Sequence, residues 1–582
     1  MASVLLPVSL LLAALLLIPE LFGDFTAYQI GLYLIYGIAA QGIGFLWGKT
    51  GVLPLGQALF FGFAAYVTAI TLRAETGLIT ELALAVAVLV AIAVFACALA
   101  ALIFRGRNDS GPYFSLITLA LVMIAEQIAG TATTLTGGFN GLSGFDSLGK
   151  LDPFAGFYYV IVGVTVAVSL LLFVLNRLPV NLIARAVADN EPRLQLLGFP
   201  THIIKGAAFA FSAVIAALAG GGCLPSHQGI VTPTSMGFGL SAELVILTAV
   251  GGRYHVLGPL IGAVLVGWAS AELRDSFPYW ELLMAVAFIL VVLKAPGGIA
   301  ELLEAGYRRV RATKPGAPSK VIAAPPTKAV DAAGPLRFDD VHLQIGVVRI
   351  LNGVSFQTPA TGIVSIIGPN GAGKTSTLNT ITGNLRITGG RITFGRRKID
   401  SRPPYKALHS GIGRKLQVPS VFFSMSVSEN LAIAMMANRS RLLDLLRPST
   451  YRWRSRSLSD LLDHPSVPLK EELVEPVDHL PQGHRQFLEY AMTIAAEPQV
   501  LLLDEPCAGL SPDETALMTD LVRHYQAETG GLVIVIEHDM SIVEAISDKV
   551  LVMHLGQVLA FDTFEQVRRN PEVQAVYAGG TK

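Results

Sequence analysis

The stretch Gly368-Pro-Asn-Gly-Ala-Gly-Lys374-Thr375 follows directly on the apolar run Ile363-Val-Ser-Ile-Ile367. The pattern G-x-x-x-x-G-K-[ST], placed between a strand and a helix, is typical of a loop that binds nucleotide phosphates. Its glycines let the backbone turn N–H groups toward phosphate oxygens, and the positive end of the following helix favours the same anion. A chance glycine-rich turn is the alternative, and eight residues in register after a strand disfavour it. The stretch therefore predicts that the chain binds ATP.

We expect the phosphates and the metal ion to be held mainly by this loop. Lys374 can reach the β- and γ-phosphates, and the Thr375 hydroxyl can contact Mg²⁺. The residues expected to contact the nucleotide here are Gly368, Asn370, Gly371, Ala372, Gly373, Lys374, Thr375 and Ser376.

Polar residues at the ends of other strands extend this prediction. A buried apolar strand ends in Asp504, which is placed to hold Mg²⁺, and the next residue, Glu505, can polarise an attacking water. His538 follows a second apolar strand and can orient the water and the γ-phosphate, while Gln417 is placed to sense the nucleotide. A lone His or Gln is more often structural, but four elements in this order indicate ATP hydrolysis. We expect Thr375, Gln417 and Asp504 to hold the Mg²⁺.

The composition divides the chain into two halves. Of its 582 residues, 52% are hydrophobic and only 15% are charged, well below the charged fraction of an average soluble protein. Charges are sparse before about residue 300 and ordinary afterwards, which indicates a membrane half joined to a soluble half. The formal net charge of zero disfavours binding to nucleic acids, because proteins that bind them usually carry an excess of basic residues.

Residues 1–304 contain apolar segments of the length that crosses a lipid membrane, about 20 residues. The first segment lacks a basic start and a small-residue cleavage site, so we interpret it as a span and not as a secretory signal. The segments predict about eight to ten helices; the clear candidates are 3–22, 27–47, 81–104, 112–130, 156–177, 206–224, 257–271 and 279–295. Two further stretches, 52–73 and 240–250, are short or interrupted by glycine.

Basic residues in the loops predict the orientation. The loop 131–155 has only Lys150, beside two aspartates, so it is expected to face outward. The loop 178–205 is expected to face the cytoplasm because it is basic; its cations are Arg185, Arg193 and Lys205.

Two stretches of the membrane half have open interpretations. The interrupted segment 51–62 either lines a solute path or packs closely against other helices through its small residues. The cytoplasmic stretch 185–198 either docks on the ATPase as a short coupling helix or is a solvated connector.

The membrane half resembles a known family at several places in the same order. The stretch Leu53-Pro-Leu-Gly-Gln-Ala-Leu-Phe-Phe-Gly-Phe-Ala-Ala-Tyr66 is similar to the early signature of the permeases of branched-chain amino acid ABC importers. Further similar stretches are 111–120, 136–144, 184–198 and 251–259. The resemblance covers nearly the whole half and implies an M-type permease subunit, with 184–198 at the contact to its ATPase.

The soluble half begins after a stretch rich in Ala, Pro and Lys, residues 305–334, which we interpret as a flexible linker. From 335 to 582 strands alternate with helices, which predicts an α/β domain. The half resembles the ATP-binding subunit of ABC transporters, and its last segment, 556–577, is similar to the branched-chain amino acid branch. The expected fold is thus an all-α polytopic membrane domain followed by an α/β P-loop ABC ATPase domain.

Two positions depart from the family pattern. The signature LSxGQ stands here as Leu480-Pro-Gln-Gly483-His484, so Gly483 is kept while a serine and a glutamine are replaced. In this family the signature closes over ATP bound by another ATPase, and proline has neither a hydroxyl nor an N–H to offer. Ile345 occupies the position of an aromatic residue that stacks on adenine, and an aliphatic contact should hold the base more weakly.

These departures suggest a heteromeric importer in the cell inner (plasma) membrane, with a cytoplasmic ATPase that uses ATP and Mg²⁺. The resemblance implies these partners: a second permease, a second ATPase with an intact signature, an extracytoplasmic substrate-binding protein and a small-molecule solute. The alternatives are a homodimeric exporter half-transporter and a membrane-tethered regulatory ATPase. Exporters of that kind usually have fewer and longer helices, and intact Glu505 and His538 disfavour a purely regulatory role.

Overall fold

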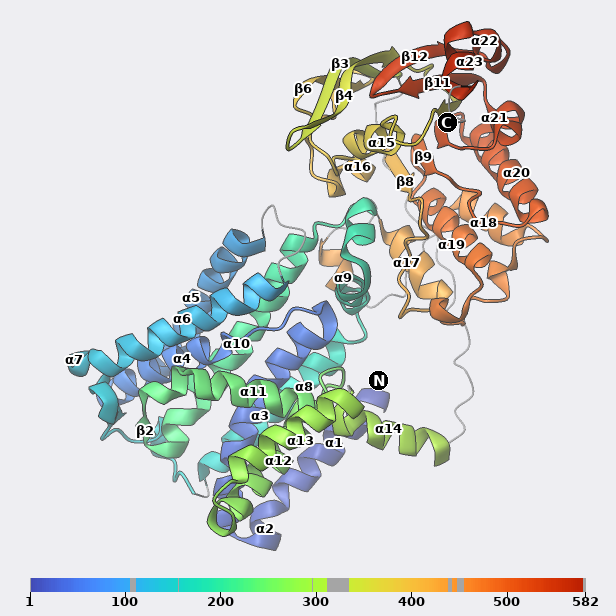
Figure 1. The fold of residues 1–582 in the computed structure, drawn as a ribbon. Coiled ribbons are helices and arrows are strands. Elements are labelled where there is room, and N and C mark those ends of the chain that lie inside the picture. Colours follow the sequence, from blue (N-terminus) through green and yellow to red (C-terminus); the bar gives the residue numbers. More distant parts are fainter. Residues whose placement is uncertain are drawn as a thin grey trace. The chain divides into compact units, whose positions relative to one another are not determined.

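The computed structural model describes residues 2–104, 111–154, 156–295, 297–310, 334–437, 442–446 and 455–578. The chain divides into two compact units, drawn together in Figure 1. The first contains residues 1–188 and 201–316, and the second contains residues 189–200 and 317–582. Most of the predicted linker, 311–333, lies outside the described residues, and the predicted domain boundaries stay a prediction.

The first unit is helical, as its long apolar segments predict. Each of the ten segments proposed from the sequence coincides with one helix or, at the N-terminus, with two short ones. The described helices between residues 2 and 310, of which α9 continues into the second unit from residue 189, are α1 (Ala2–Leu16), α2 (Ile18–Phe22), α3 (Asp24–Thr50), α4 (Gln57–Arg73), α5 (Leu78–Phe104), α6 (Gly111–Thr131), α7 (Thr133–Thr136), α8 (Gly156–Leu175), α9 (Pro179–Leu196), α10 (Thr201–Gln228), α11 (Phe238–Gly251), α12 (Gly258–Ser276), α13 (Trp280–Lys294) and α14 (Gly298–Val310).

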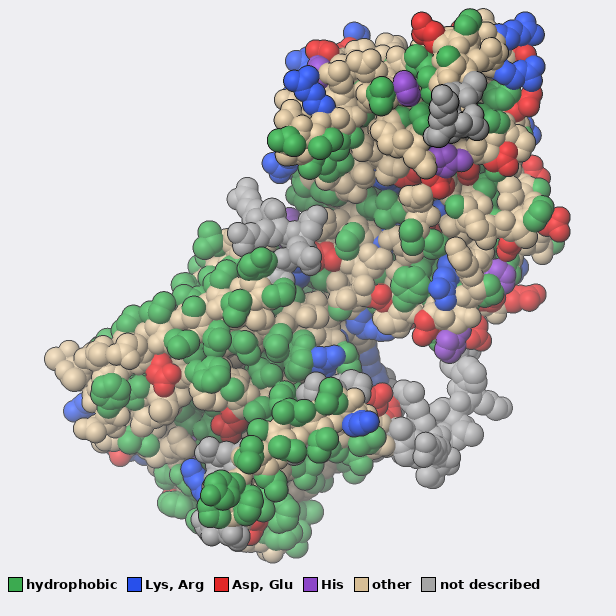
Figure 2. Space-filling model, viewed as in Figure 1, with side chains coloured by type: hydrophobic (Ala, Val, Ile, Leu, Met, Phe, Trp, Pro, Cys, Tyr) green, Lys and Arg blue, Asp and Glu red, His purple; other side chains and the backbone are tan. Residues whose placement is uncertain are grey.

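Among the described residues, five of these helices are long and apolar enough to cross a membrane: α3, α5, α6, α8 and α10. Hydrophobic side chains cover much of the visible face of this unit in Figure 2, with few charges among them. A surface of this composition suits lipid, because charged groups are costly at membrane depth.

Small residues let the central helices of the first unit approach closely. Helix α10 packs against α3, α4 and α5. A side chain at Gly220 of α10 would overlap the carbonyl oxygen of Phe61 in α4, so the two backbones touch there. Close approach through glycine is a common way for helices to associate in membranes.

The interruption between α3 and α4, residues 51–56, is held inside the protein. The Ser115 hydroxyl of α6 donates a hydrogen bond of 2.6 Å to the Leu53 carbonyl, and a side chain at Gly56 would collide with Thr118. The exposed backbone that an interrupted helix leaves is thereby satisfied by protein groups. This geometry supports close packing, and a contribution to the solute path stays a prediction.

The glycine-rich loop 136–144 has a defined structure, beyond the turn cluster that its composition predicts. Its strand β1 (Leu142–Ser143) pairs antiparallel with β2 (Ile230–Val231), between α10 and α11. Gly141 has φ +76°, and a side chain there would overlap the Val231 carbonyl. Glycine is required at this position because both its backbone conformation and its surroundings exclude a side chain.

The described residues of the second unit form two sheets. The larger has the order β12-β11-β5-β10-β9-β8, and all its neighbours are parallel except β12, which is antiparallel to β11. Its strands are β5 (Gly362–Ile367), β8 (Ile412–Lys415), β9 (Val500–Asp504), β10 (Leu532–Ile536), β11 (Lys549–His554) and β12 (Gln557–Asp562). The smaller sheet is antiparallel, with the order β4-β3-β6-β7; its strands are β3 (Leu336–Ile345), β4 (Val348–Gln357), β6 (Gly389–Phe394) and β7 (Arg397–Lys398).

Helices complete the second unit around these sheets (Figure 1). Strands β5, β8, β9 and β10 are buried along their whole length, as expected for parallel strands covered on both faces. The helices are α15 (Lys374–Thr382), α16 (Tyr405–His409), α17 (Val427–Met436), α18 (Arg456–Asp463), α19 (Gln482–Ala495), α20 (Pro512–Thr529), α21 (Met540–Ile546), α22 (Phe564–Arg569) and α23 (Pro571–Ala578).

Candidate functional site

Three adjacent parallel strands bring the predicted site residues to one edge of the larger sheet. Strand β10 lies between β5 and β9, and its last residue, Ile536, pairs with Ile366 on one side and with Asp504 on the other. The segments that leave the carboxyl ends of these strands therefore start side by side. Ligands of open α/β sheets bind at this kind of edge.

The loop after β5 has the conformation that a phosphate cradle requires. Gly371 and Gly373 have φ of +82° and +96°, the left-handed region that favours glycine. Gly373 is the residue before α15, so the positive end of that helix points into the loop. A side chain at Gly371 would meet nothing within 4 Å, which leaves open space in front of the loop.

Lys374 lies folded over its own loop. Its Nζ donates to the carbonyl oxygens of Gly368 at 2.8 Å and of Pro369 at 3.1 Å. Burial lowers the pKa of this ammonium, and the carboxylates of Glu505 and Asp504 oppose that shift. The lysine therefore lies over the phosphate loop, and its contact with the phosphates stays a prediction.

Asp504 lies between the loop helix and a buried arginine. Its Oδ1 is 3.4 Å from the Thr375 hydroxyl, and its Oδ2 is 3.1 Å from Nη2 of Arg414 in β8. Burial raises the pKa of the Asp504 carboxyl, while Arg414 opposes the shift. The sequence did not predict that Arg414 belongs to the site. A cation inside a fully buried strand does indicate that the cation has an acidic partner.

Glu505 contacts both of the other predicted polar residues. Its Oε2 accepts a hydrogen bond of 2.9 Å from Gln417, and its Oε1 is 3.0 Å from Nε2 of His538. Its φ of +47° is uncommon for a residue with a side chain, and such strain often occurs at functional positions. The structure thus brings Gln417, Glu505 and His538 into one cluster beside Asp504.

The types and positions of these residues are suited to binding a magnesium ion and a nucleoside triphosphate. The Thr375 hydroxyl and the Asp504 carboxylate converge, and hard oxygen donors of this kind are the ligands that Mg²⁺ prefers. The Gln417 amide group points to Glu505 in this structure, and its assignment to the metal stays a prediction.

The altered signature lies at the start of α19. Pro481 stands immediately before the helix and makes no side-chain hydrogen bond to it. His484 is engaged elsewhere, because its Nδ1 is 2.8 Å from Oε1 of Glu472. The carboxylate of Glu514 lies so near Gly483 that a side chain there would overlap it. The helix end that the family uses for phosphate therefore has an acidic neighbour here.

Ile345 is the last residue of β3 and pairs with Val348 across the hairpin to β4. Half of its surface is exposed, and Val347 at the tip of the hairpin is almost fully exposed. An exposed apolar tip agrees with a contact to a flat apolar ring, and the adenine assignment stays a prediction.

Residues 189–200 pack within the second unit. Helix α9 is kinked at Asn190, where φ is −149° and ψ is 81°. Oδ2 of Asp189 accepts hydrogen bonds from the backbone N–H of Ser424 at 2.7 Å and from its hydroxyl at 2.6 Å. Nδ2 of Asn190 donates to the Ser420 hydroxyl at 3.0 Å. These contacts support the docked interpretation of this stretch over the solvated one.

Arg193 is the most deeply inserted residue of this stretch, and its side chain is fully buried. Nη1 donates to the Arg414 carbonyl at 2.9 Å and lies 3.4 Å from Oε1 of Glu489 in α19. Nη2 donates to the Glu489 carbonyl at 3.2 Å and to the Thr493 hydroxyl at 3.1 Å. The sequence places Arg193 in a cytoplasmic loop and within the stretch 185–198 that can dock on the ATPase, and it does not predict the contacts of this side chain.

Glu489 connects Arg193 to the segment that precedes Gln417. Its Oε1 also accepts from the backbone N–H of Leu416, the residue before Gln417, at 2.9 Å, and its Oε2 lies 3.8 Å from Nζ of Lys415. Burial raises the pKa of the Glu489 carboxyl, and the cations Arg193 and Lys415 oppose the shift. We call Arg193, Lys415 and Glu489 the buried charge cluster.

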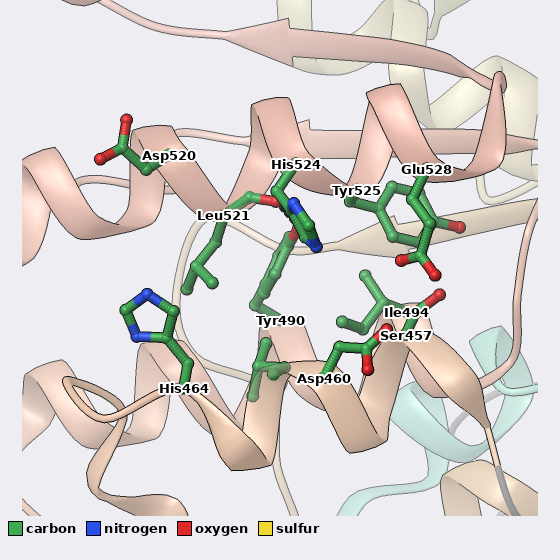
Figure 3. Close-up of a pocket in the computed structure, with 11 residues that line it drawn as sticks. Ser457, Asp460, His464, Tyr490, Ile494, Asp520, Leu521, His524, Tyr525 and Glu528 are labelled. Atoms are coloured by element: carbon green, nitrogen blue, oxygen red, sulfur yellow. Dashed lines mark hydrogen bonds between the residues drawn. The ribbon is translucent and has the colours of Figure 1, made fainter.

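A separate cavity of about 350 Å³ lies between α18, α19 and α20 (Figure 3). It is lined by His464, His524 and Asp520, with Tyr490 in its wall. None of the predicted nucleotide-binding residues lines it.

Comparison with known proteins gives matches to both units. A family model described as the permease component of the branched-chain amino acid transport system matches residues 25–293, and one described as ABC transporter matches residues 351–508. The high-affinity branched-chain amino acid transport ATP-binding protein LivG of Salmonella typhimurium is 34% identical over 251 residues, which is 42% of this chain and 97% of that protein. The corresponding protein BraF of Pseudomonas aeruginosa is 35% identical over 248 residues, with the same coverage.

Solved structures also match the second unit. One is a nucleotide-free ATP-binding cassette from an ABC transporter, at 27% identity and a TM-score of 0.36, covering 42% of this chain and 98% of that one.

Proposed function

Because the chain belongs to the ABC transporter family, as a branched-chain amino acid-type permease and its ATP-binding cassette in one polypeptide, we propose a specific role for each half. The second unit hydrolyses ATP, and that hydrolysis drives uptake of a solute through the first unit. The solutes we propose are branched-chain amino acids or closely related small molecules, because the relatives LivG and BraF are named for that transport.

The observation that carries the proposal is the convergence of one cation and two acids at the edge of the larger sheet. Lys374 and the N–H groups of its loop bind the phosphates, and Thr375 and Asp504 hold Mg²⁺, which neutralises phosphate charge when it is bound. Glu505 accepts a proton from the attacking water as general base. His538 and Gln417, each hydrogen-bonded to Glu505, orient that carboxylate and the water.

We propose that the stretch 189–200 transmits movement of the cassette to the permease. Its hydrogen bonds to Ser420 and Ser424 and the buried Arg193 support this role. Closure of paired cassettes around ATP would move the stretch, as lid closure moves other enzyme segments.

We further propose a heteromeric assembly. The start of α19 is poorly suited to bind the phosphates of a second ATP. It has Pro481, a His484 that contacts Glu472, and the carboxylate of Glu514 nearby. A second ATPase with an intact signature would complete the site built on Lys374 and Glu505. A second permease and an extracytoplasmic substrate-binding protein would complete the importer, in the inner membrane of the cell.

The test is ATP turnover of the purified chain in lipid, alone and after co-expression with candidate partner subunits. We expect negligible turnover alone and restored turnover with partners. Glu505→Gln should then lower turnover by about 100-fold or more, with ATP binding retained, because a general base contributes that much. Full turnover by the chain alone would contradict the heteromeric proposal, and turnover that survives Glu505→Gln would contradict the role of Glu505.

A further inference from the structure

A carboxylate lies at the middle depth of the first unit, on a helix too short to be a regular span. Helix α11 has 14 residues, about 21 Å at 1.5 Å per residue. It packs on α3 and α12, and Glu243 is its sixth residue. Short and interrupted helices near the membrane midplane often form the solute site of transporters.

Contacts with α3 fix the depth of Glu243. Tyr28 near the start of α3 stacks on His227, which precedes α11, with ring centroids 4.3 Å apart. Lys49 near the end of α3 donates to the carbonyl of Tyr254, which follows α11, at 3.2 Å. The two helices therefore run in the same direction across the unit.

A hydrogen bond between the two helices places the carboxylate more closely. The Thr248 hydroxyl of α11 donates to the Ala40 carbonyl of α3 at 3.1 Å, and Glu243 lies five residues before Thr248, so it is level with the residues just before Gly37. Gly37 is the middle residue of α3, a helix of 27 residues. Glu243 thus lies near the midplane of a helix that is long enough to cross the membrane.

Glu243 differs in its contacts from Glu126, another carboxylate near α11. Glu126 of α6 accepts a hydrogen bond of 3.2 Å from the backbone N–H of Phe238, where it caps the start of α11. Glu243 makes no hydrogen bond or ion pair within the described part of the chain. Its side chain is exposed, although its helix neighbours Ser241 and Leu244 are buried.

An exposed carboxylate at this depth is unsuited to a lipid-facing surface. Even the mildest scales assign a penalty of about 2.5 kcal/mol or more to an acidic side chain at the membrane centre. This face of α11 therefore faces water or a cation. Aromatic rings, which also attract cations, lie at the same level of α3: the ring of Tyr36 is 6.0 Å from that of Phe61 in α4, the helix that follows the interruption.

We propose that Glu243 binds the ammonium group of the transported solute at the membrane midplane. The inference rests on the proposed uptake function and narrows its solute class to molecules that carry a primary ammonium group, such as amino acids. Solutes without that group, including amides and organic acids, would be excluded.

The first experiment measures uptake of radiolabelled L-leucine, L-isoleucine and L-valine by cells that express the full chain with its partner subunits. Unlabelled L-leucine and 4-methylpentanoate, which has the same carbon skeleton without the amine, serve as competitors. We expect leucine to compete at least tenfold better than 4-methylpentanoate. Equal competition by the two would overturn the inference, and this comparison needs no variant to fold.

The second experiment compares Glu243→Gln, Glu243→Asp and the control Glu81→Gln, at the start of α5. We expect Glu243→Gln to raise the KM of uptake at least tenfold, Glu243→Asp to raise it less, and the control to leave it unchanged. Co-purification of the second permease should stay at the wild-type level in all three, which checks that each variant folds and assembles.

Two results of this experiment would overturn the inference. One is an unchanged KM in Glu243→Gln. The other is loss of the co-purified second permease, which would show that Glu243 pairs with a cation of that subunit. A wild-type chain that takes up none of the three amino acids would instead contradict the proposed function itself.

Discussion

The buried charge cluster allows a prediction about which of its three residues the cassette needs most. Two cations, Arg193 and Lys415, share the single carboxylate of Glu489, and all three side chains are fully buried. We expect Glu489→Gln to destabilise the cassette most, Arg193→Met less, and Lys415→Met least.

The magnitudes follow from the charges that each substitution leaves. Glu489→Gln leaves two buried cations without an anion, and breaking a buried pair in this way costs about 3–5 kcal/mol. Arg193→Met removes contacts to Glu489, Thr493 and the Arg414 carbonyl but leaves a neutral pair of Lys415 and Glu489, so we expect about 3 kcal/mol. Lys415→Met removes only the 3.8 Å contact with Glu489 and leaves the closer pair of Arg193 and Glu489. We therefore expect this substitution to destabilise the cassette by about 1 kcal/mol or less.

The pH dependence of Arg193→Met provides a separate check. Burial raises the pKa of Glu489, and loss of Arg193 should raise it further. A carboxyl with a raised pKa binds its proton more tightly in the folded state than in the unfolded state, so the folded state is favoured at low pH. The stability deficit of the variant relative to the wild type should therefore grow as pH rises from the raised pKa of Glu489 in the wild-type fold to its higher pKa in the variant, by at most about 1.4 kcal/mol per pH unit.

Hydrogen exchange of the full chain measures these effects locally, in peptides from α19 and β8. A loss of about 3 kcal/mol should speed exchange that occurs through local opening on the order of 100-fold. Arg337→Met is the control, because its pair with Asp339 is exposed and should contribute little. Equal effects of Glu489→Gln and Lys415→Met, or exchange in Arg193→Met that matches the control, would refute the reasoning.

Three further variants test other parts of the structure. Ile345→Tyr should tighten ATP binding about threefold to tenfold by adding a ring contact, measured by nucleotide titration; unchanged affinity would remove Ile345 from the base site. Pro481→Ser combined with His484→Gln should raise ATP turnover of the chain alone by about tenfold or more, and no rise would mean that the signature is not what limits it. Gly220→Ala should lower the thermal stability of the first unit, because a methyl group there overlaps the Phe61 carbonyl; wild-type stability would show that α4 and α10 separate easily.

The sequence predicted the parts of the site that depend on local pattern. The phosphate loop, Asp504, Glu505 and His538 each follow an apolar strand, and parallel strands bring their carboxyl ends together. The apolar segments of the membrane half predicted its helices for a similar reason, since length and hydrophobicity suffice to define a span.

The residues that the sequence did not predict depend on long-range packing. Arg193 and Glu489 are far apart in the chain. The local sequence around each of them does not predict that the two side chains will form a buried ion pair. Arg414 and Glu243 did carry a signal, because a charge inside an apolar run is rare without a partner or a function. That signal indicates that a partner exists and leaves its identity open.

The placement of residues 189–200 with the second unit has a consequence for how the protein is made. Arg193 precedes Glu489 by 296 positions. At about 5–20 residues per second, a ribosome completes Arg193 roughly 15–60 s before the carboxylate that neutralises it. During that interval the guanidinium stays hydrated, and the cassette can form its charge cluster only by capturing a segment that was synthesised much earlier. The buried charge cluster can therefore form only after the last third of the chain has been translated, although one of its cations lies in the first third.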